Sequence, residues 1–201
     1  LGVLLAAASF PALAKIPPDL QLTSVATGLT NPVALRSPED NSGRLFVLER
    51  GGSIRIIEGG GKLLDTPYYT RSVNTDDVER GLLGIAFDPD FASNGTLYIV
   101  YTDSGSNGEI LRRLVAEDPA ANTFSGSDTE VMRIPLFYNH NGGDIHFGPD
   151  NYLYWSTGSG TGSFDPEDLS QDLWKKTVSN LEYYLMGKIL RVDVRNPAKS
   201  A

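Results

Sequence analysis

One histidine in this chain lies where a side chain could remove a proton from a ligand. His140 is followed by the polar loop Asn141-Gly142-Gly143, and an apolar segment begins at Ile145. Glycines at such a point let the backbone and a ligand approach closely, and loops that lead into buried strands often carry functional side chains. An imidazole titrates near neutral pH, which suits general-base chemistry. His140 is therefore the residue to explain: from these residues alone a structural loop histidine is the favoured interpretation, and a catalytic histidine is the alternative.

The residues after His140 predict the strands that would hold it in place. Residues 143–147 and 152–156 alternate apolar with small or polar side chains, and the turn Gly148-Pro149-Asp150-Asn151 separates them. This pattern is typical of two antiparallel strands joined by a hairpin. His146 lies within the first strand and is interpreted as a packed or rim residue, because a metal pair with His140 would still need a third ligand.

The same order of segments occurs three times along the chain. Each repeat contains an apolar strand, a turn with a proline, a second strand and a third strand that carries a basic residue; the marker prolines Pro38, Pro89 and Pro149 lie 51 and 60 residues apart. Repeats of this size are typical of the blades of a β-propeller, whereas a β-sandwich would not be expected to repeat one pattern three times. The repeats comprise residues 32–38, 44–48 and 53–57; 82–90, 96–101 and 109–114; and 143–150, 152–156 and 188–194. The main loops are expected at residues 59–61, 65–78, 103–108, 118–128 and 158–184.

Composition agrees with an all-β fold and excludes several other classes of protein. The 201 residues are 40% hydrophobic and include 21 glycines and 12 prolines, which favours short strands and many turns. The net charge is −8 and no basic cluster occurs, so nucleic acid is not expected as a partner. The chain has no cysteine, which excludes disulfides, thiolate zinc sites and cysteine nucleophiles.

The N-terminal residues resemble the second half of a secretory signal peptide. Residues 1–10 are apolar but too few to span a bilayer, and Pro11-Ala12-Leu13-Ala14 ends in a small-x-small cleavage pattern. A buried first strand or helix is disfavoured because Pro17 and Pro18 follow closely. We therefore expect a partial signal peptide at 1–14, a mature chain without a membrane span, and a secreted or periplasmic location. Residues 15–201 are expected to form the N-terminal part of a single propeller domain, since three repeats cannot close a ring.

Three motifs of the chain together resemble a known family. They are residues 79–91, residues 140–158 and residues 186–191. In this order they are similar to the soluble glucose/sorbosone dehydrogenases, six-bladed β-propellers that use pyrroloquinoline quinone (PQQ), and they also resemble the propeller of hedgehog-interacting proteins. The resemblance covers residues 22–194. It implies that about three of the six blades lie in this chain.

The resemblance also implies a reaction, the oxidation of an aldose at its anomeric hydroxyl. A histidine at the position of His140 would take the hydroxyl proton while a hydride passes to PQQ, and Ca²⁺ would polarise the quinone carbonyl. Glu79 and Asn139 fall at positions that would contact the sugar, although the family usually has glutamine at the first. The partners would be the sugar and an electron acceptor. The cofactor's arginine and lysine ligands lie mostly in later blades, so cofactor and metal ligands are not assigned here.

Two departures from the family pattern leave other functions open. Ser159 falls where an aspartate commonly orients the histidine, and a serine cannot stabilise an imidazolium by charge; Asp144 or Asp165 could substitute. Ser159 and the unusual Glu79 together support an alternative function, a non-catalytic propeller that binds a protein or glycan. A propeller hydrolase would need converging carboxylates and asparagines, for which Glu79 and residues 139–141 are the candidates.

Overall fold

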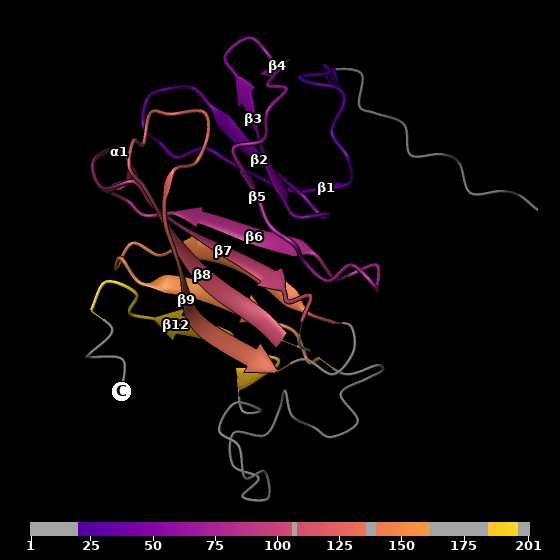
Figure 1. Ribbon diagram of the computed structural model, residues 1–201, viewed down its shortest axis with the longest axis vertical. Helices are drawn as coiled ribbons and strands as arrows, with labels where there is room; N and C mark the ends of the chain where they lie inside the picture. The colour runs from indigo at the N-terminus through magenta and orange to yellow at the C-terminus, as the bar shows by residue number, and fades with distance from the viewer. Residues whose placement is uncertain (1–19, 106–107, 136–139, 161–184, 197–201) are drawn as a thin grey trace, which may run out of the picture.

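The computed structural model describes residues 20–105, 108–135, 140–160 and 185–196, which form three antiparallel sheets in succession along the chain (Figure 1). The first sheet contains β1 (Pro32–Arg36), β2 (Leu45–Glu49), β3 (Ser53–Glu58), β4 (Lys62–Leu63) and β5 (Tyr69–Thr70). The second contains β6 (Leu82–Phe87), β7 (Thr96–Thr102), β8 (Gly108–Ala116) and β9 (Gly126–Pro135), with the short helix α1 (Phe91–Asn94) between β6 and β7. The third contains β10 (Gly142–Phe147), β11 (Leu153–Thr157) and β12 (Ile189–Val192). The expected signal peptide, Asn139 and most of the loop 158–184 lie outside the described residues.

Each sheet is a meander in which neighbouring strands follow the order of the chain. The first sheet has the order β1-β2-β3-β4, with β5 as a third partner of β3, the second has the order β6-β7-β8-β9 and the third the order β10-β11-β12. The first strands of the sheets lie side by side, with β6 between β1 and β10. In Figure 1 the three sheets accordingly form successive layers, the arrangement of neighbouring propeller blades.

The central strand β7 explains why part of the sequence is apolar at every position. Leu97, Ile99 and Tyr101 belong to the core between the first and second sheets, whereas Tyr98 and Val100 belong to the core between the second and third. Because successive side chains of a strand point to opposite faces, a strand that is buried on both faces needs apolar residues throughout. The second sheet is therefore the middle layer of a stack.

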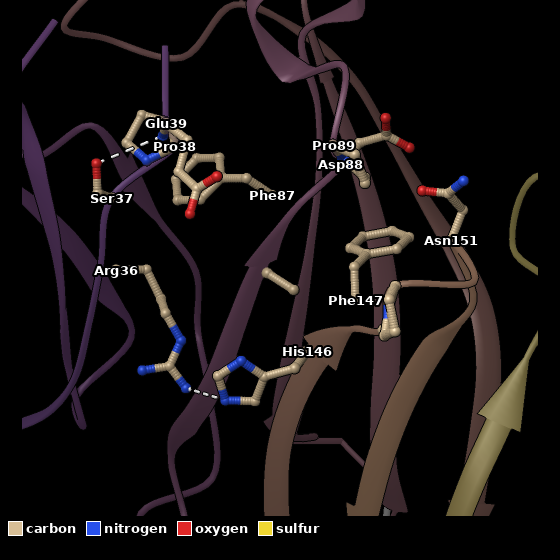
Figure 2. A pocket seen from close by; sticks show the side chains of 13 residues that line it. Arg36, Ser37, Pro38, Glu39, Phe87, Asp88, Pro89, His146, Phe147 and Asn151 are labelled. Carbon is tan, nitrogen blue, oxygen red and sulfur yellow. Dashed lines mark hydrogen bonds between the residues drawn. The ribbon is translucent and has the colours of Figure 1, made fainter. Parts of the chain in front are cut away.

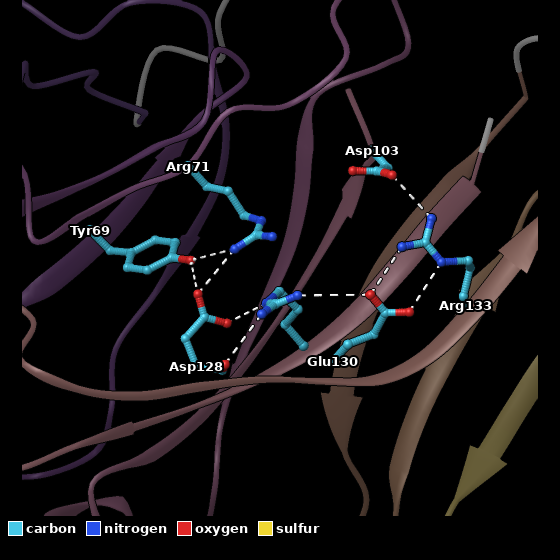
Figure 3. Close-up of polar contacts among 7 residues, drawn as sticks. Tyr69, Arg71, Asp103, Asp128, Glu130 and Arg133 are labelled. Carbon is cyan, nitrogen blue, oxygen red and sulfur yellow. Dashed lines mark hydrogen bonds and ion pairs between the residues drawn. The ribbon is translucent and has the colours of Figure 1, made fainter. Parts of the chain in front are cut away.

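A network of polar side chains joins the first sheet to the outer strand of the second (Figure 3). The Asp128 carboxylate on β9 accepts hydrogen bonds from the Tyr69 hydroxyl at 2.7 Å and from the Arg71 guanidinium at 3.0 Å. Asp128 also pairs with Arg112, which lies 3.8 Å from Glu130. These groups are partly exposed, so each pair contributes little by itself and the network mainly fixes how the two sheets meet.

The repeated turns converge at one end of the first strands. Pro38, Pro89 and Pro149 line a single cavity of about 420 Å³, together with the last residues of β1, β6 and β10. The three strands therefore run in the same direction, and Figure 2 shows this cavity with Pro38 and Pro89 among its lining residues. Because Glu79 precedes β6 and His140 precedes β10, both lie at the other end of these strands.

The loop prediction for residues 118–128 is wrong at its end, where β9 begins. This strand pairs with β8 from Gly126 to Pro135, and it gives the second sheet a fourth strand that the repeat pattern did not contain. Only Ile134 is buried along β9, so the hydrophobic pattern that marks the inner strands is absent. The short strand β5 also lies within residues 65–78, which were expected to be a loop. No helix among the described residues is long and apolar enough to cross a membrane.

Candidate functional site

His140 has a backbone conformation that needs support from its surroundings. The residue is exposed, lies just before β10, and has a φ of 57°. Such a left-handed conformation is uncommon for a residue other than glycine and costs free energy unless neighbouring contacts fix it. The local structure must therefore hold His140 from more than one side.

Residues from two loops, one before β6 and one after β11, hold the main chain of His140. The Glu79 carboxylate accepts a hydrogen bond from the His140 N–H, and the His140 carbonyl oxygen accepts one from the Gly160 N–H at 3.1 Å. The next carbonyl, that of Asn141, accepts a hydrogen bond from the Gly158 N–H at 2.7 Å. The imidazole, by contrast, makes no hydrogen bond or ion pair with the described part of the chain. The ring is therefore available to a ligand while its backbone is fixed.

The glycines around His140 permit this close main-chain packing. A Cβ atom at Gly158 would lie 1.5 Å from the His140 carbonyl oxygen, and one at Gly142 would lie 2.6 Å from the Ser156 carbonyl oxygen. Gly142 also has a φ of 78°, which other residues rarely adopt. The sequence predicts close approach at Gly142 and Gly143, and the structure adds Gly158 from the neighbouring strand.

The structure brings together two of the predicted site residues. Glu79 and His140 are 61 residues apart in the chain, yet the carboxylate of one binds the main-chain N–H of the other. Glu79 is otherwise exposed, and a contact of its carboxylate with a sugar stays a prediction. Asn139, the other predicted sugar ligand, lies outside the described residues.

The structure shows what surrounds the residues proposed to orient His140. Ser159 lies between Gly158 and Gly160, whose N–H groups bond to Asn141 and His140. Asp144 is committed elsewhere: its carboxylate lies 2.7 Å from Arg36 Nη2 and 3.2 Å from His146 Nε2. Asp165 lies outside the described residues. Ser159 is therefore adjacent to the His140 segment, whereas Asp144 belongs to a different cluster.

That second cluster lies at the opposite end of β10. Arg36 Nη2 lies 2.7 Å from His146 Nε2, and both residues line the cavity in which the repeated turns meet (Figure 2). The side chains of His146 and Asp144 are 57% and 59% exposed. His146 is thus a rim residue, and its partner Arg36 on another sheet could not be identified from local sequence patterns.

A buried acidic residue near His140 was not identified from the sequence. Glu109 on β8 is fully buried, and burial raises the pKa of its carboxyl well above the usual range. Asn141 and Trp155 are also buried in this region, and in the described structure their side-chain nitrogen and oxygen atoms lack hydrogen-bond partners. A glutamate beside the apolar run from Ile110 was the available signal, but its burial depends on the packing of the third sheet.

The described residues at the His140 end provide groups that suit a hydroxylated ligand. They provide an uncommitted imidazole and an exposed carboxylate, which suit a hydroxylated substrate. Arg50 donates to the carbonyl oxygens of Asp77 and Arg80, at 2.9 Å each, and so braces the loop before β6. Within the described ranges no three histidines or carboxylates are grouped to hold a metal ion. The groups that would pair with the carboxylates of PQQ are therefore not assigned.

The sheets and the site define this protein as part of a β-propeller with a candidate catalytic histidine at one end of its inner strands. The chain belongs to the glucose/sorbosone dehydrogenase family, since residues 29–194 match the model of that family, "Glucose / Sorbosone dehydrogenase". The predicted resemblance to this family is confirmed.

The chain is similar both to proteins named as sugar dehydrogenases and to proteins named as hedgehog-interacting proteins. The PQQ-bound structure of the aldose sugar dehydrogenase from Streptomyces coelicolor is 34% identical with a TM-score of 0.66, covering 85% of this chain and 46% of that one. Hedgehog-interacting protein of Mus musculus is 32% identical over 191 residues, which cover 87% of this chain and 26% of that protein. Quinoprotein glucose dehydrogenase B of Acinetobacter calcoaceticus is 25% identical over 185 residues, covering 85% of this chain and 38% of that one. The all-β propeller fold is confirmed, and the chain spans less than half the length of these relatives.

Proposed function

We propose that this chain is part of a quinoprotein sugar dehydrogenase that oxidises an aldose at its anomeric hydroxyl. The observation that carries the proposal is the state of His140, whose main chain is fixed by Glu79 and Gly160 while its imidazole has no partner among the described residues. A general base needs this combination, because it must be held in position and still be free to bond to the substrate.

His140 would act as the general base. A ring nitrogen accepts the proton of the anomeric hydroxyl while the C1–H bond breaks with its electron pair, and the sugar becomes a lactone. PQQ, when bound with Ca²⁺, supplies the hydride acceptor for this oxidation. Glu79 and Asn139 are the proposed hydrogen-bonding partners of the other sugar hydroxyls. The reduced site would then pass its electrons to a separate acceptor, and the proposed location is the periplasm or the extracellular space.

Two relatives whose names describe sugar dehydrogenases support this assignment. One is a PQQ-bound aldose sugar dehydrogenase and another is named a quinoprotein glucose dehydrogenase. Both align with the stretch that contains Glu79 and His140, because each covers about 85% of this chain. The cofactor and the reaction class are therefore proposed by family, and the role of His140 by geometry.

The test is sugar-dependent dye reduction by the protein in its natural full length, loaded with PQQ and Ca²⁺ and given a panel of aldoses. His140→Ala is expected to lower kcat by about 10²- to 10⁴-fold, the usual contribution of a general base. The chain offers a matched control in its other histidine, and His146→Ala is expected to change kcat by less than about twofold. Absence of both dye reduction and PQQ binding in the folded wild-type protein would sink the proposal.

A second candidate function is a propeller that binds a protein or glycan without catalysis. The chain is 32% identical to a hedgehog-interacting protein, which favours it, and Ser159 falls where the family resemblance leads us to expect an aspartate. Equilibrium dialysis against PQQ separates the two candidates. A folded protein that takes up no PQQ in the presence of Ca²⁺ but retains a glycan or protein ligand would establish the binding function.

A further inference from the structure

Glu109 is a buried acid for which the proposed reaction has no role. Its side chain is 0% exposed, and in the described structure neither carboxyl oxygen has a hydrogen-bond partner. A buried carboxyl without partners is costly and rarely occurs without a function. The position of Glu109 therefore needs an explanation.

The Glu109 carboxyl lies against the segment that carries His140. A Cβ atom at Gly143 would lie 2.9 Å from Glu109 Oε1 and 2.6 Å from the Leu83 Cβ atom, so these two side chains occupy the space beside Gly143. Gly143 itself has a φ of 96° and is only three residues after His140. Residues of the second sheet thus support the start of β10 from one side, while Gly158 and Gly160 bind it from the other.

The surroundings of Glu109 favour an uncharged carboxyl. Burial is the main cause of its raised pKa, and the Trp155 indole has an opposite and smaller effect. Among the described residues no positive charge contributes, and a lone carboxylate in such a place would lose its hydration without compensation. A neutral carboxyl can both donate and accept a hydrogen bond, which complements the indole N–H of Trp155 and a main chain that passes as close as Gly143.

We propose that Glu109 is a positioning residue, an uncharged carboxyl that braces the Asn141–Gly143 segment and so fixes the backbone of His140. Glu109 does not reach the reacting atoms in this role. It acts through Gly143, and its loss would let the left-handed backbone at His140 relax. The effect on catalysis rests on the proposed function, whereas the effect on the backbone does not.

The experiment compares Glu109→Leu with Glu109→Gln in the protein of natural full length. Leucine removes the polar group at similar volume, while glutamine reproduces an uncharged carboxyl. Glu117→Gln is the matched control, because Glu117 is exposed just after the other end of β8. The first measurement is amide hydrogen exchange of peptides that cover residues 140–160, with peptides of β2 and β3 as an internal reference. The second is the separation of kcat from KM for the aldose.

In Glu109→Leu, exchange in residues 140–160 is expected to accelerate about tenfold while β2 and β3 keep their protection. The same variant is expected to lower kcat about tenfold with KM little changed, and Glu109→Gln to restore both within about twofold. A glutamine variant as impaired as the leucine variant would overturn the proposal, because the site would then require a charge. So would unchanged exchange in Glu109→Leu, or faster exchange in all sheets alike. If the wild type oxidises no sugar, the exchange data still decide, so failure of the proposed function is distinguishable.

Discussion

The two histidines of this chain lie at opposite ends of one strand and are held in opposite ways. His140 is fixed through its main chain, by Glu79 and Gly160, and its imidazole has no partner in the part of the chain that the structure describes. His146 lies in a regular strand, and its imidazole is engaged by Arg36 and Asp144. A ring that is bound by neighbouring charges supports structure, whereas a ring that is free on a fixed backbone can serve a substrate. The comparison therefore distinguishes a candidate catalytic end from a structural end.

Among the substitutions around the two histidines, we expect the largest effect from one that disturbs the main-chain packing at His140. In Gly158→Ala the new methyl group would collide with the His140 carbonyl oxygen, 1.5 Å away, and the His140 segment must move. We expect the free energy of unfolding to fall by about 3 kcal/mol. Sugar oxidation should fall about 100-fold, since small displacements of a catalytic group are costly. Urea denaturation and steady-state kinetics measure the two effects.

Gly59→Ala is the control for this substitution, because a Cβ atom at Gly59 would have no neighbour within 4 Å. Its free energy of unfolding should stay within about 0.5 kcal/mol of wild type. If Gly158→Ala is as stable and active as Gly59→Ala, the close contact with His140 is not needed, and the claim that main-chain packing fixes His140 is wrong.

A smaller effect is expected from removal of the Glu79 carboxylate. Glu79→Ala breaks the hydrogen bond to the His140 N–H, and we expect kcat/KM for the aldose to fall about tenfold, the usual value of a bond to a charged group. Glu79→Gln keeps an acceptor and should recover most of the loss. Asp144→Ala removes the carboxylate that pairs with Arg36 and His146, and it should change kcat/KM by less than about twofold. Equal losses in Glu79→Ala and Asp144→Ala would contradict the distinction between the two ends.

The parts of the fold that the sequence predicts are those in which burial leaves a pattern. The hairpin of β10 and β11 was predicted because its residues alternate between core and surface, and the pairing of Ile145 with Trp155 confirms it. The three repeats were predicted because their proline turns recur, and these turns now line one cavity. The strand β9 was missed because its single buried residue, Ile134, gives no periodic signal.

The candidate site was predicted only where a motif marked it. His140 and Glu79 were selected from a family resemblance, and their contact across 61 residues follows from the packing of two sheets, which local patterns do not contain. Glu109 was not selected at all. A glutamate beside an apolar run could equally be a surface residue at a strand end, and its burial against Gly143 follows from packing between the second and third sheets. Contacts between sheets therefore hold the information that the sequence alone lacks.

The buried acid behind His140 gives a prediction about pH. The pKa of Glu109 is higher in the folded than in the unfolded chain, so between these two values the folded state holds the extra proton. Its contribution to stability is therefore complete below the unfolded pKa and is lost as pH rises toward the folded pKa. Glu109→Gln cannot titrate, so in urea denaturation it should gain stability relative to wild type as the pH rises above the pKa of an unfolded glutamate. Glu117→Gln should follow the wild-type dependence, and a Glu109→Gln curve parallel to wild type would contradict burial of a neutral carboxyl.

We expect the smallest effect in the cluster around His146, which is held by exposed charged side chains and not by main-chain contacts. The Arg36 guanidinium lies 2.7 Å from Asp144, but the two side chains are 28% and 59% exposed, so water and salt screen their attraction. Arg36→Gln should lower the free energy of unfolding by less than about 1 kcal/mol, and the difference from wild type should shrink in high salt. Urea denaturation in low and high salt measures this, with dye reduction expected to stay near wild type in both. A large loss of activity would show that the cluster of Arg36, Asp144 and His146 supports catalysis. An exposed ion pair with a purely structural role contributes too little free energy for its loss to displace His140.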